Sequence, residues 1–113
     1  MITILHNPRC SKSREGLSIL ERSGKDFKVI KYLDEPISID TLKHIISLLG
    51  IAPIELIRKN EAIWKSKFKN MTLSDDDIIN AMIENPKLIE RPIVIHNKKA
   101  AIGRPSQNIL NIL

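Results

Sequence analysis

The only cysteine of this chain, Cys10, lies where a first strand is expected to give way to a first helix. Residues 1–5 are apolar or β-branched, Pro8 interrupts the strand, and a helix can begin at Ser11. Unpaired N–H groups and the dipole at a helix N-terminus favour a thiolate over a thiol. Basic residues add positive charge on both sides of the thiol: Arg9, Lys12 and Arg14. The pattern therefore predicts a reactive thiolate at Cys10 rather than a buried structural cysteine.

Three arginines stand where the chain is expected to change direction. Arg58 follows a short helix, Arg91 precedes the third strand and Arg104 follows the fourth. A planar guanidinium donates paired hydrogen bonds to tetrahedral oxyanions. If the three converge on Cys10, they would bind an oxyanion and offset its repulsion from the thiolate. Convergence is a property of the tertiary structure.

Hydrophobic spacing and turn residues predict the elements that must position these side chains. The first third is expected to form a strand, a helix and a strand over residues 2–6, 11–23 and 27–33. The middle is expected to be helical, with starts at Ser38, Pro53 and Ser74 and stops at Gly50 and Pro86. The last third is expected to form a hairpin and a short helix, over residues 92–96, 100–103 and from 105 onward.

A βαβ unit and a ββα unit together make a four-stranded mixed α/β sheet with helices on both faces. This is the thioredoxin-like architecture, here with a helical insertion over about residues 38–85 and one domain over residues 1–113. The loop before the third strand of such a sheet lies beside the first helix. Arg91 is therefore expected near Cys10.

Composition narrows the class of protein. The chain has 113 residues, 42% hydrophobic and 27% charged, an ordinary globular balance. Its net charge of +5 suits small anions or acidic partners, whereas dispersed basic residues and 4% aromatics argue against nucleic acid. No apolar stretch is long enough for a membrane span, and no signal peptide is evident. One cysteine cannot build a disulfide framework, so a cytoplasmic protein is expected.

No metal site is expected. Three consecutive carboxylates begin the helix after Ser74, but consecutive residues point to different sides of a helix. Their expected role is pairing with the helix dipole. Neither His44 nor His96 is spaced with Cys10 as a metal site would require. Trp64 is expected to serve packing.

Several different short motifs follow one another along the chain: His6-Asn-Pro-Arg-Cys10-Ser-Lys-Ser-Arg14, Tyr32-Leu, Arg58-Lys-Asn60, Asn85-Pro86, Glu90-Arg-Pro-Ile-Val94 and Gly103-Arg-Pro-Ser106. On these motifs the chain resembles the glutaredoxin-coupled arsenate reductase family, which has a thioredoxin-like fold. The resemblance implies that Cys10 attacks arsenate and that the oxyanion is held by Arg58, Arg91 and Arg104. It also implies a cis Arg91–Pro92 bond. The chain departs from the pattern at Arg9, where the best-studied arsenate reductases carry a small residue.

The resemblance implies external reductants, glutathione followed by glutaredoxin, and no bound cofactor. This agrees with the residues, because a chain with one cysteine cannot resolve an adduct through an internal disulfide. Three neighbours of Cys10 are candidates for tuning its thiolate: His6, Asn7 and Ser13. Ser13 occupies the second cysteine position of a Cys-x-x-Cys pair and is either a donor to the thiolate or an ordinary first-turn serine. His6 is either an electrostatic neighbour of the thiolate or a structural histidine.

Two alternatives keep the fold and change the function. One is a thiol–disulfide exchanger acting on glutathione mixed disulfides. The other is a non-enzymatic, thioredoxin-like regulator that binds RNA polymerase. That regulator typically carries Cys-x-x-Cys, and it leaves the three arginines unexplained. Thiol-dependent NADPH consumption with and without arsenate separates these possibilities.

Overall fold

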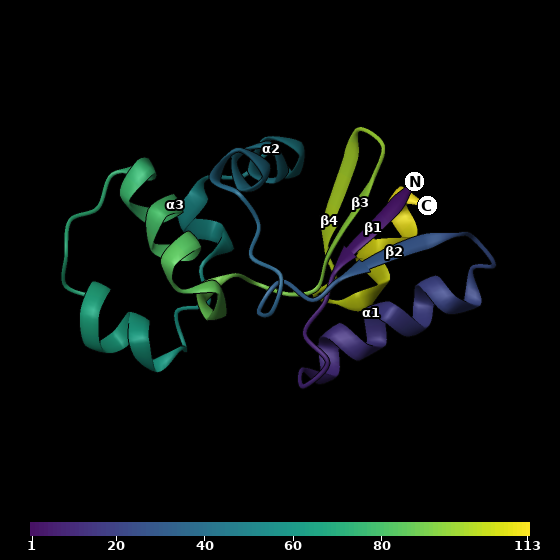
Figure 1. The fold of residues 1–113 in the computed structure, drawn as a ribbon, viewed down its shortest axis with the longest axis horizontal. Coiled ribbons are helices and arrows are strands. Elements are labelled where there is room, and N and C mark those ends of the chain that lie inside the picture. Colours follow the sequence, from purple (N-terminus) through teal and green to yellow (C-terminus); the bar gives the residue numbers. More distant parts are fainter. The chain divides into compact units, whose positions relative to one another are not determined.

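The computed structural model describes residues 1–113 and contains one mixed sheet of four strands in the order β2-β1-β3-β4. The strands are β1 (Ile2–Leu5), β2 (Phe27–Ile30), β3 (Ile93–His96) and β4 (Lys99–Ile102). The α-helices are α1 (Ser11–Arg22), α2 (Ile39–Leu49) and α3 (Asp75–Glu84). Contacts divide the chain into a sheet unit (Met1–Glu35 with Arg91–Leu113) and a helical unit (Pro36–Glu90). Figure 1 shows the course of the chain through both.

In the sheet unit, β1 is one of the two inner strands and pairs parallel with β2 and antiparallel with β3. The parallel pair is joined through α1, as expected of a βαβ crossover. Strands β3 and β4 pair antiparallel, which completes the predicted hairpin. The predicted thioredoxin-like mixed sheet is confirmed.

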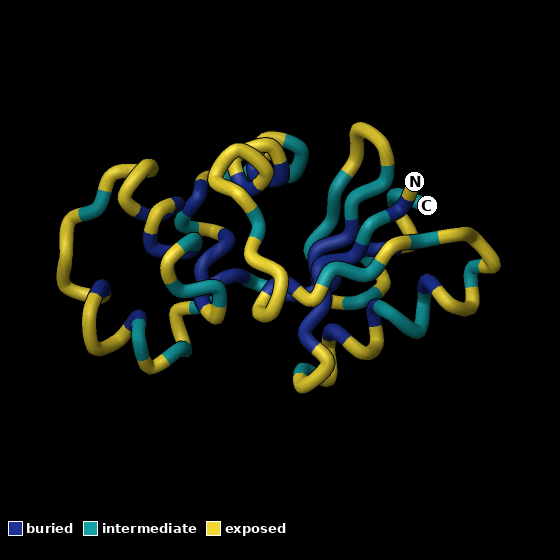
Figure 2. Tube along the Cα trace, in the orientation of Figure 1, coloured by how far each residue is buried: buried dark blue, intermediate teal, exposed yellow.

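One hydrophobic cluster holds the sheet unit together and joins the sheet to both of its helices. Ile2 and Ile4 of β1 pack in this cluster with Leu20 of α1 and Ile109 of the C-terminal 3-10 helix (Ser106–Ile112). Figure 2 shows the same distribution, with buried residues concentrated in the strands and along one side of α1. Because these side chains share one cluster, α1 and the C-terminal helix cover the same face of the sheet. The prediction of helices on both faces of the sheet also concerns the helical insertion, and for that part it stays a prediction.

Three boundaries in the first third differ from those predicted, the first being the end of β1 at Leu5 and not at residue 6. The second strand ends at Ile30, not at residue 33, because the backbone N–H groups of Asp34 and Glu35 both donate to the carbonyl of Lys31 and close a turn. Helix α1 ends at Arg22, one residue early, and Gly24 follows with a φ of 73°. A positive φ favours glycine, as expected for the residue that terminates a helix.

The helical unit follows the capping signals in the sequence. Ser38 caps α2 through a hydrogen bond from the Thr41 N–H, and Gly50 ends it in the left-handed conformation. Ser74 and Asp77 form a capping box at the start of α3. Trp64 stacks on Phe68, with ring centroids 5.8 Å apart, and the two residues bound a π-helical turn that was not predicted. The stacking confirms the packing role expected for the tryptophan.

At the C-terminal end β3 begins one residue later than predicted and ends at His96 as predicted, whereas β4 lies one residue earlier than predicted, over Lys99–Ile102. Asn97 opens the turn with a φ of 57°, which asparagine tolerates better than most residues. The final helix is a 3-10 helix over Ser106–Ile112. No helix is long and apolar enough to cross a bilayer.

Two glycines leave a niche for the ring of Pro92, the residue that follows Arg91. A Cβ atom on Gly16 of α1 would lie 2.8 Å from the Pro92 Cγ, and one on Gly103 would lie 2.7 Å from the same atom. Both would also press on Ile109 of the C-terminal helix. The absence of these two side chains therefore lets the start of β3 sit against the N-terminal half of α1.

We expect Gly16→Ala to destabilise the protein by about 1–3 kcal/mol, the usual cost of overpacking a core. The sign of this change in stability is informative, because Gly→Ala within a helix otherwise stabilises a protein by about 0.5–1 kcal/mol. Urea denaturation measures the free energy of unfolding, and Ser18→Ala on the same helix is the control. A Gly16→Ala protein as stable as the wild type would show that the niche tolerates a methyl group.

Candidate active site

Cys10 is the N-cap residue of α1, with φ −97° and ψ 124°, which confirms its predicted place at the helix N-terminus. Its backbone is held on both sides. The N–H donates to the Asn7 carbonyl at 3.0 Å, and the carbonyl accepts from the Arg14 N–H at 3.0 Å. The sulfur makes no capping hydrogen bond, and the residue is partly exposed. The thiol is thus placed at the positive end of the helix while its sulfur stays available for chemistry.

Hydrogen bonds fold the segment before Cys10 into a defined loop. The Asn7 Oδ1 accepts from the Arg9 N–H at 3.0 Å, and the Asn7 N–H donates to the Ser13 Oγ at 2.9 Å. The Arg14 guanidinium donates to the Pro8 carbonyl at 2.9 Å. These bonds connect the loop to the first turn of α1 and so hold Cys10 in place.

His6 and Ser13 are buried together beneath this loop. The His6 Nδ1 lies 2.7 Å from the Ser13 Oγ, and the side chains are 4% and 0% exposed. Of the two roles considered for Ser13, the structure favours the structural one, since the hydroxyl bonds to His6 and to the Asn7 backbone. Burial lowers the pKa of His6, and the positive charges of Lys31 and Arg14 lower it further. His6 is therefore a neutral, structural partner of Ser13 at physiological pH.

The lowered pKa of His6 predicts a loss of stability in mild acid. Below the ordinary histidine value of 6.5 the unfolded chain takes up a proton that the folded chain resists, so stability falls as the pH drops. We expect His6→Asn to lessen this fall. Urea denaturation at about pH 7.5 and about pH 5.5 measures it, either side of the histidine pKa. His44→Asn, at an exposed position on α2, is the control. An unchanged pH dependence in His6→Asn would mean that another group is responsible.

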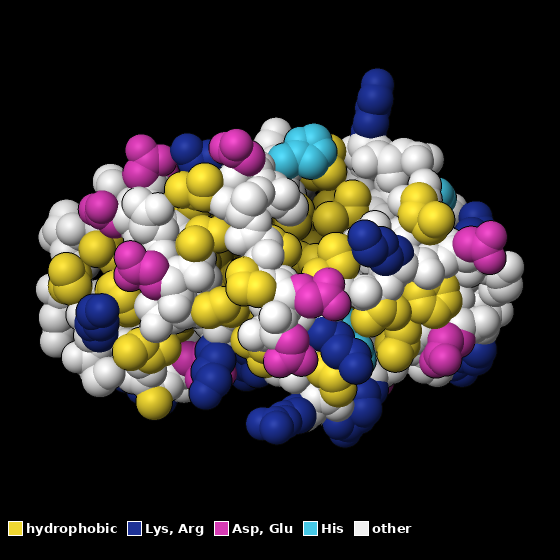
Figure 3. Space-filling model, viewed as in Figure 1, with side chains coloured by type: hydrophobic (Ala, Val, Ile, Leu, Met, Phe, Trp, Pro, Cys, Tyr) yellow, Lys and Arg dark blue, Asp and Glu magenta, His cyan; other side chains and the backbone are white.

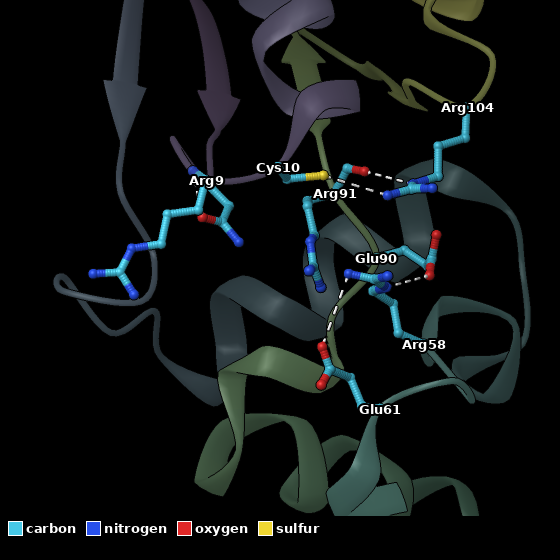
Figure 4. A network of polar contacts seen from close by, with 8 residues as sticks. Arg9, Cys10, Arg58, Glu61, Glu90, Arg91 and Arg104 are labelled. Carbon is cyan, nitrogen blue, oxygen red and sulfur yellow. Dashed lines mark hydrogen bonds and ion pairs between the residues drawn. The ribbon is translucent and has the colours of Figure 1, made fainter.

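The Arg104 side chain links the C-terminal segment of the sheet unit to the Cys10 sulfur in its N-terminal segment. Its Nη2 donates to the Cys10 Sγ at 3.4 Å, and its Nε donates to the Arg91 carbonyl at 2.8 Å (Figure 4). Asn108 supports the same turn through hydrogen bonds to the Arg104 and Ile102 carbonyls, both at 3.2 Å. The Arg91–Pro92 bond is cis, as the family resemblance implies, and so is the Arg104–Pro105 bond. The hydrogen bonds to the Arg91 carbonyl and from Asn108 therefore hold Arg104 with its guanidinium beside the thiol.

Arg91, 9% exposed, lies in the same unit at the start of β3. Its carbonyl contact with Arg104 places the two arginines next to each other, with one of them on Cys10. The Arg104 guanidinium beside the sulfur can neutralise charge on an incoming oxyanion, and a guanidinium can donate two parallel hydrogen bonds to such an anion. Thiolate attack on a bound oxyanion is chemistry that this arrangement can perform.

Arg58 belongs to the helical unit and has its own partners there. Its Nε lies 3.5 Å from Glu90 and its Nη1 lies 3.9 Å from Glu61, with all three side chains about a fifth to a quarter exposed (Figure 4). A backbone exchange adds to this arrangement, because the Arg58 N–H donates to Leu88 and the Glu90 N–H donates to Leu56. The structure thus places two of the three predicted arginines in the unit that carries Cys10, and the third in the other unit.

Sequence reasoning missed the residues that hold the arginines. Glu61 and Glu90 pair with Arg58, and Asn108 braces Arg104. Glu90 is the first residue of the motif Glu90-Arg-Pro-Ile-Val94. A carboxylate among the arginine motifs was the one sequence signal for a partner of Arg58. Nothing in the sequence marks Asn108. No group of three histidine, cysteine, aspartate or glutamate side chains in residues 1–113 is arranged to hold a metal ion.

Comparison with known proteins places this site in a family. Residues 5–112 match the model of the ArsC family. The chain is 45% identical to the arsenate reductase of Neisseria meningitidis serogroup A, over 99% of this chain and 97% of the relative. It is 44% identical to the uncharacterized protein YfgD of Escherichia coli K12, over 99% and 96%. The solved arsenate reductase of Vibrio cholerae superposes with a TM-score of 0.93 at 45% identity, covering 99% and 97%. This confirms the relationship that the motifs indicate: the chain belongs to the ArsC family.

Proposed function

We propose that this protein reduces arsenate to arsenite, with Cys10 as the nucleophile. One observation carries the proposal: the only thiol of the chain lies at the N-terminus of α1, with the Arg104 guanidinium 3.4 Å from its sulfur. The helix end and the cation both stabilise negative charge on sulfur and on an incoming oxyanion. The names of the ArsC relatives, arsenate reductases at 40–45% identity, support arsenate as that oxyanion.

In the first step the Cys10 thiolate attacks arsenic(V), a sulfur–arsenic bond forms, and a protonated arsenate oxygen leaves as water. Arg91 and Arg104 neutralise the charge on the remaining oxygens. The reduction to arsenic(III) then needs two electrons, which come from two thiols that become a disulfide. The overall balance is arsenate plus two thiols giving arsenite, one disulfide and water.

The second thiol must be external, because Cys10 has no cysteine partner in the chain. We assign this role to glutathione, with glutaredoxin reducing the mixed disulfide on Cys10 afterwards. These thiols are kept reduced in the cytoplasm, where we place the reaction. The hydrogen bonds of Ser13 to His6 and Asn7 support a role in holding the loop around the nucleophile.

Arg58 enters this proposal through its motif and not through the geometry around Cys10. In the ArsC pattern the arginine of Arg58-Lys-Asn60 is the third oxyanion ligand, and we assign it that role here. Its pairing with Glu61 and Glu90 supports a side chain held in a defined direction rather than one that moves freely in solvent.

A coupled assay tests the proposed function. Purified protein, glutathione, glutaredoxin, glutathione reductase and NADPH are combined, and NADPH oxidation is followed with and without arsenate. We expect oxidation that requires arsenate and each thiol component. Oxidation with a glutathione mixed disulfide but not with arsenate would instead identify a thiol–disulfide exchanger. No turnover with either substrate would favour a binding protein.

A further inference from the structure

Arg9 stands directly before the nucleophile, yet nothing in the proposed oxyanion chemistry uses it. Its backbone is fixed, because the Arg9 N–H donates to the Asn7 side chain. Its side chain is exposed and extends to the opposite side of Cys10 from Arg104 (Figure 4). A residue at this position cannot share the oxyanion with Arg104 unless its side chain turns back. Its charge is therefore directed at a different part of the space around Cys10.

Arg9 belongs to a group of cations around the β1–α1 loop with few acidic partners. Lys12 pairs with Glu15 at 3.5 Å, and Arg14 is held on the Pro8 carbonyl. Lys31 lies close enough to His6 to lower its pKa. No carboxylate forms an ion pair with Arg9 or Lys31 within residues 1–113. Figure 3 shows Lys and Arg side chains gathered over this loop. A positive field beside a nucleophile attracts a second anion.

In the proposed reaction the reducing thiol, glutathione, is such a second anion. Arsenate occupies the side of the Cys10 sulfur that faces Arg104, so the reducing thiol must approach from another side. Glutathione carries two carboxylates and one thiol, and a tripeptide spans about 10 Å when extended. Its thiol can therefore reach Cys10 while a carboxylate lies on the exposed side of the loop, where Arg9 is.

We propose that Arg9 binds a carboxylate of the thiol co-substrate and so selects an anionic, glutathione-like peptide thiol over a neutral thiol. The inference rests on the proposed function for its place in turnover. The binding step can be isolated without arsenate, in the exchange of Cys10 with glutathione disulfide. There the Cys10 thiolate attacks one sulfur of the disulfide, the Cys10–glutathione disulfide forms, and glutathione thiolate leaves. Arg9 assists by holding a carboxylate of the incoming disulfide.

The experiment measures the rate of this exchange for wild type and Arg9→Ala, with mass spectrometry of the intact protein. Because the chain has one cysteine, each adduct reports on Cys10 alone. The comparison reagent is bis(2-hydroxyethyl) disulfide, which has no charge. We expect Arg9→Ala to slow exchange with glutathione disulfide by about two- to fivefold, the range of an exposed ion pair. The rate with the neutral disulfide should stay the same, and added salt should reduce the difference.

Two further variants separate a local contact from general charge. Arg22→Ala removes the same side chain from the far end of α1 and should behave as wild type. Arg9→Lys keeps the charge and should recover part of the lost rate. Three results would overturn the inference: equal rates in Arg9→Ala and wild type, equal slowing with both disulfides, or equal slowing in Arg22→Ala. Equal slowing with both reagents would mean that Arg9 acts on the thiolate itself.

In turnover, the same variant should raise KM for glutathione and leave KM for arsenate unchanged. Glutathione diethyl ester should give the wild type a KM close to that of the variant. If the wild type shows no arsenate-dependent turnover, the proposed function fails, while the exchange rates still decide the role of Arg9. If turnover is normal and the exchange rates are insensitive to Arg9, only the present inference fails.

Discussion

Replacing Cys10 by serine is expected to reduce arsenate-dependent NADPH oxidation to the rate without enzyme. A hydroxyl in the same place is scarcely ionised at neutral pH and is a far weaker nucleophile than a thiolate. No other thiol in the chain can take over the attack. The coupled assay with arsenate, glutathione and glutaredoxin measures the loss directly.

The same substitution is expected to leave the fold intact and even to stabilise it. Cys10 is the N-cap of α1 and its side chain makes no capping hydrogen bond, whereas serine is among the preferred N-cap residues. We expect a gain of up to about 1 kcal/mol in the free energy of unfolding, measured by urea denaturation. An inactive but destabilised variant would leave loss of fold as the cause. Full activity in a folded Cys10→Ser protein would remove Cys10 from the mechanism.

Arg104→Lys is expected to lower kcat/KM for arsenate by on the order of tenfold to a hundredfold. Lysine keeps the positive charge but lacks the planar guanidinium, in which separate nitrogens donate to the Cys10 sulfur and to the Arg91 carbonyl. A charge-assisted hydrogen bond contributes about 1.5–3 kcal/mol, which corresponds to that range of rates. Steady-state kinetics at varied arsenate concentrations provide the measurement.

Two companion measurements make the Arg104 result specific. Arg22→Lys exchanges the same residue types at an exposed position on α1 and should leave kcat/KM unchanged. Alkylation of Cys10 by iodoacetamide at neutral pH should be slower in Arg104→Lys, since the variant lacks a donor to the thiolate. A variant with unaltered kinetics would show that Arg104 contacts the thiol without assisting the reaction.

The sequence by itself determined the local features of this protein. The Ser38 and Ser74 caps, the left-handed Gly50 and the place of Cys10 at the start of α1 all follow from interactions within a few residues. Such interactions depend on residue type and spacing, so they can be predicted without the tertiary fold. The order of strands followed from the βαβ and hairpin connections, which have few alternatives.

Only the tertiary structure decided which side chains meet at the site. The contact between Arg104 and Cys10 joins residues 94 positions apart, and it depends on the start of β3 packing against α1 in the niche left by Gly16 and Gly103. The hydroxyl of Ser13 bonds to His6, although its position in the motif allowed a bond to the thiol. These outcomes were beyond prediction because a side-chain hydrogen bond requires angstrom precision, and packing between distant segments provides it.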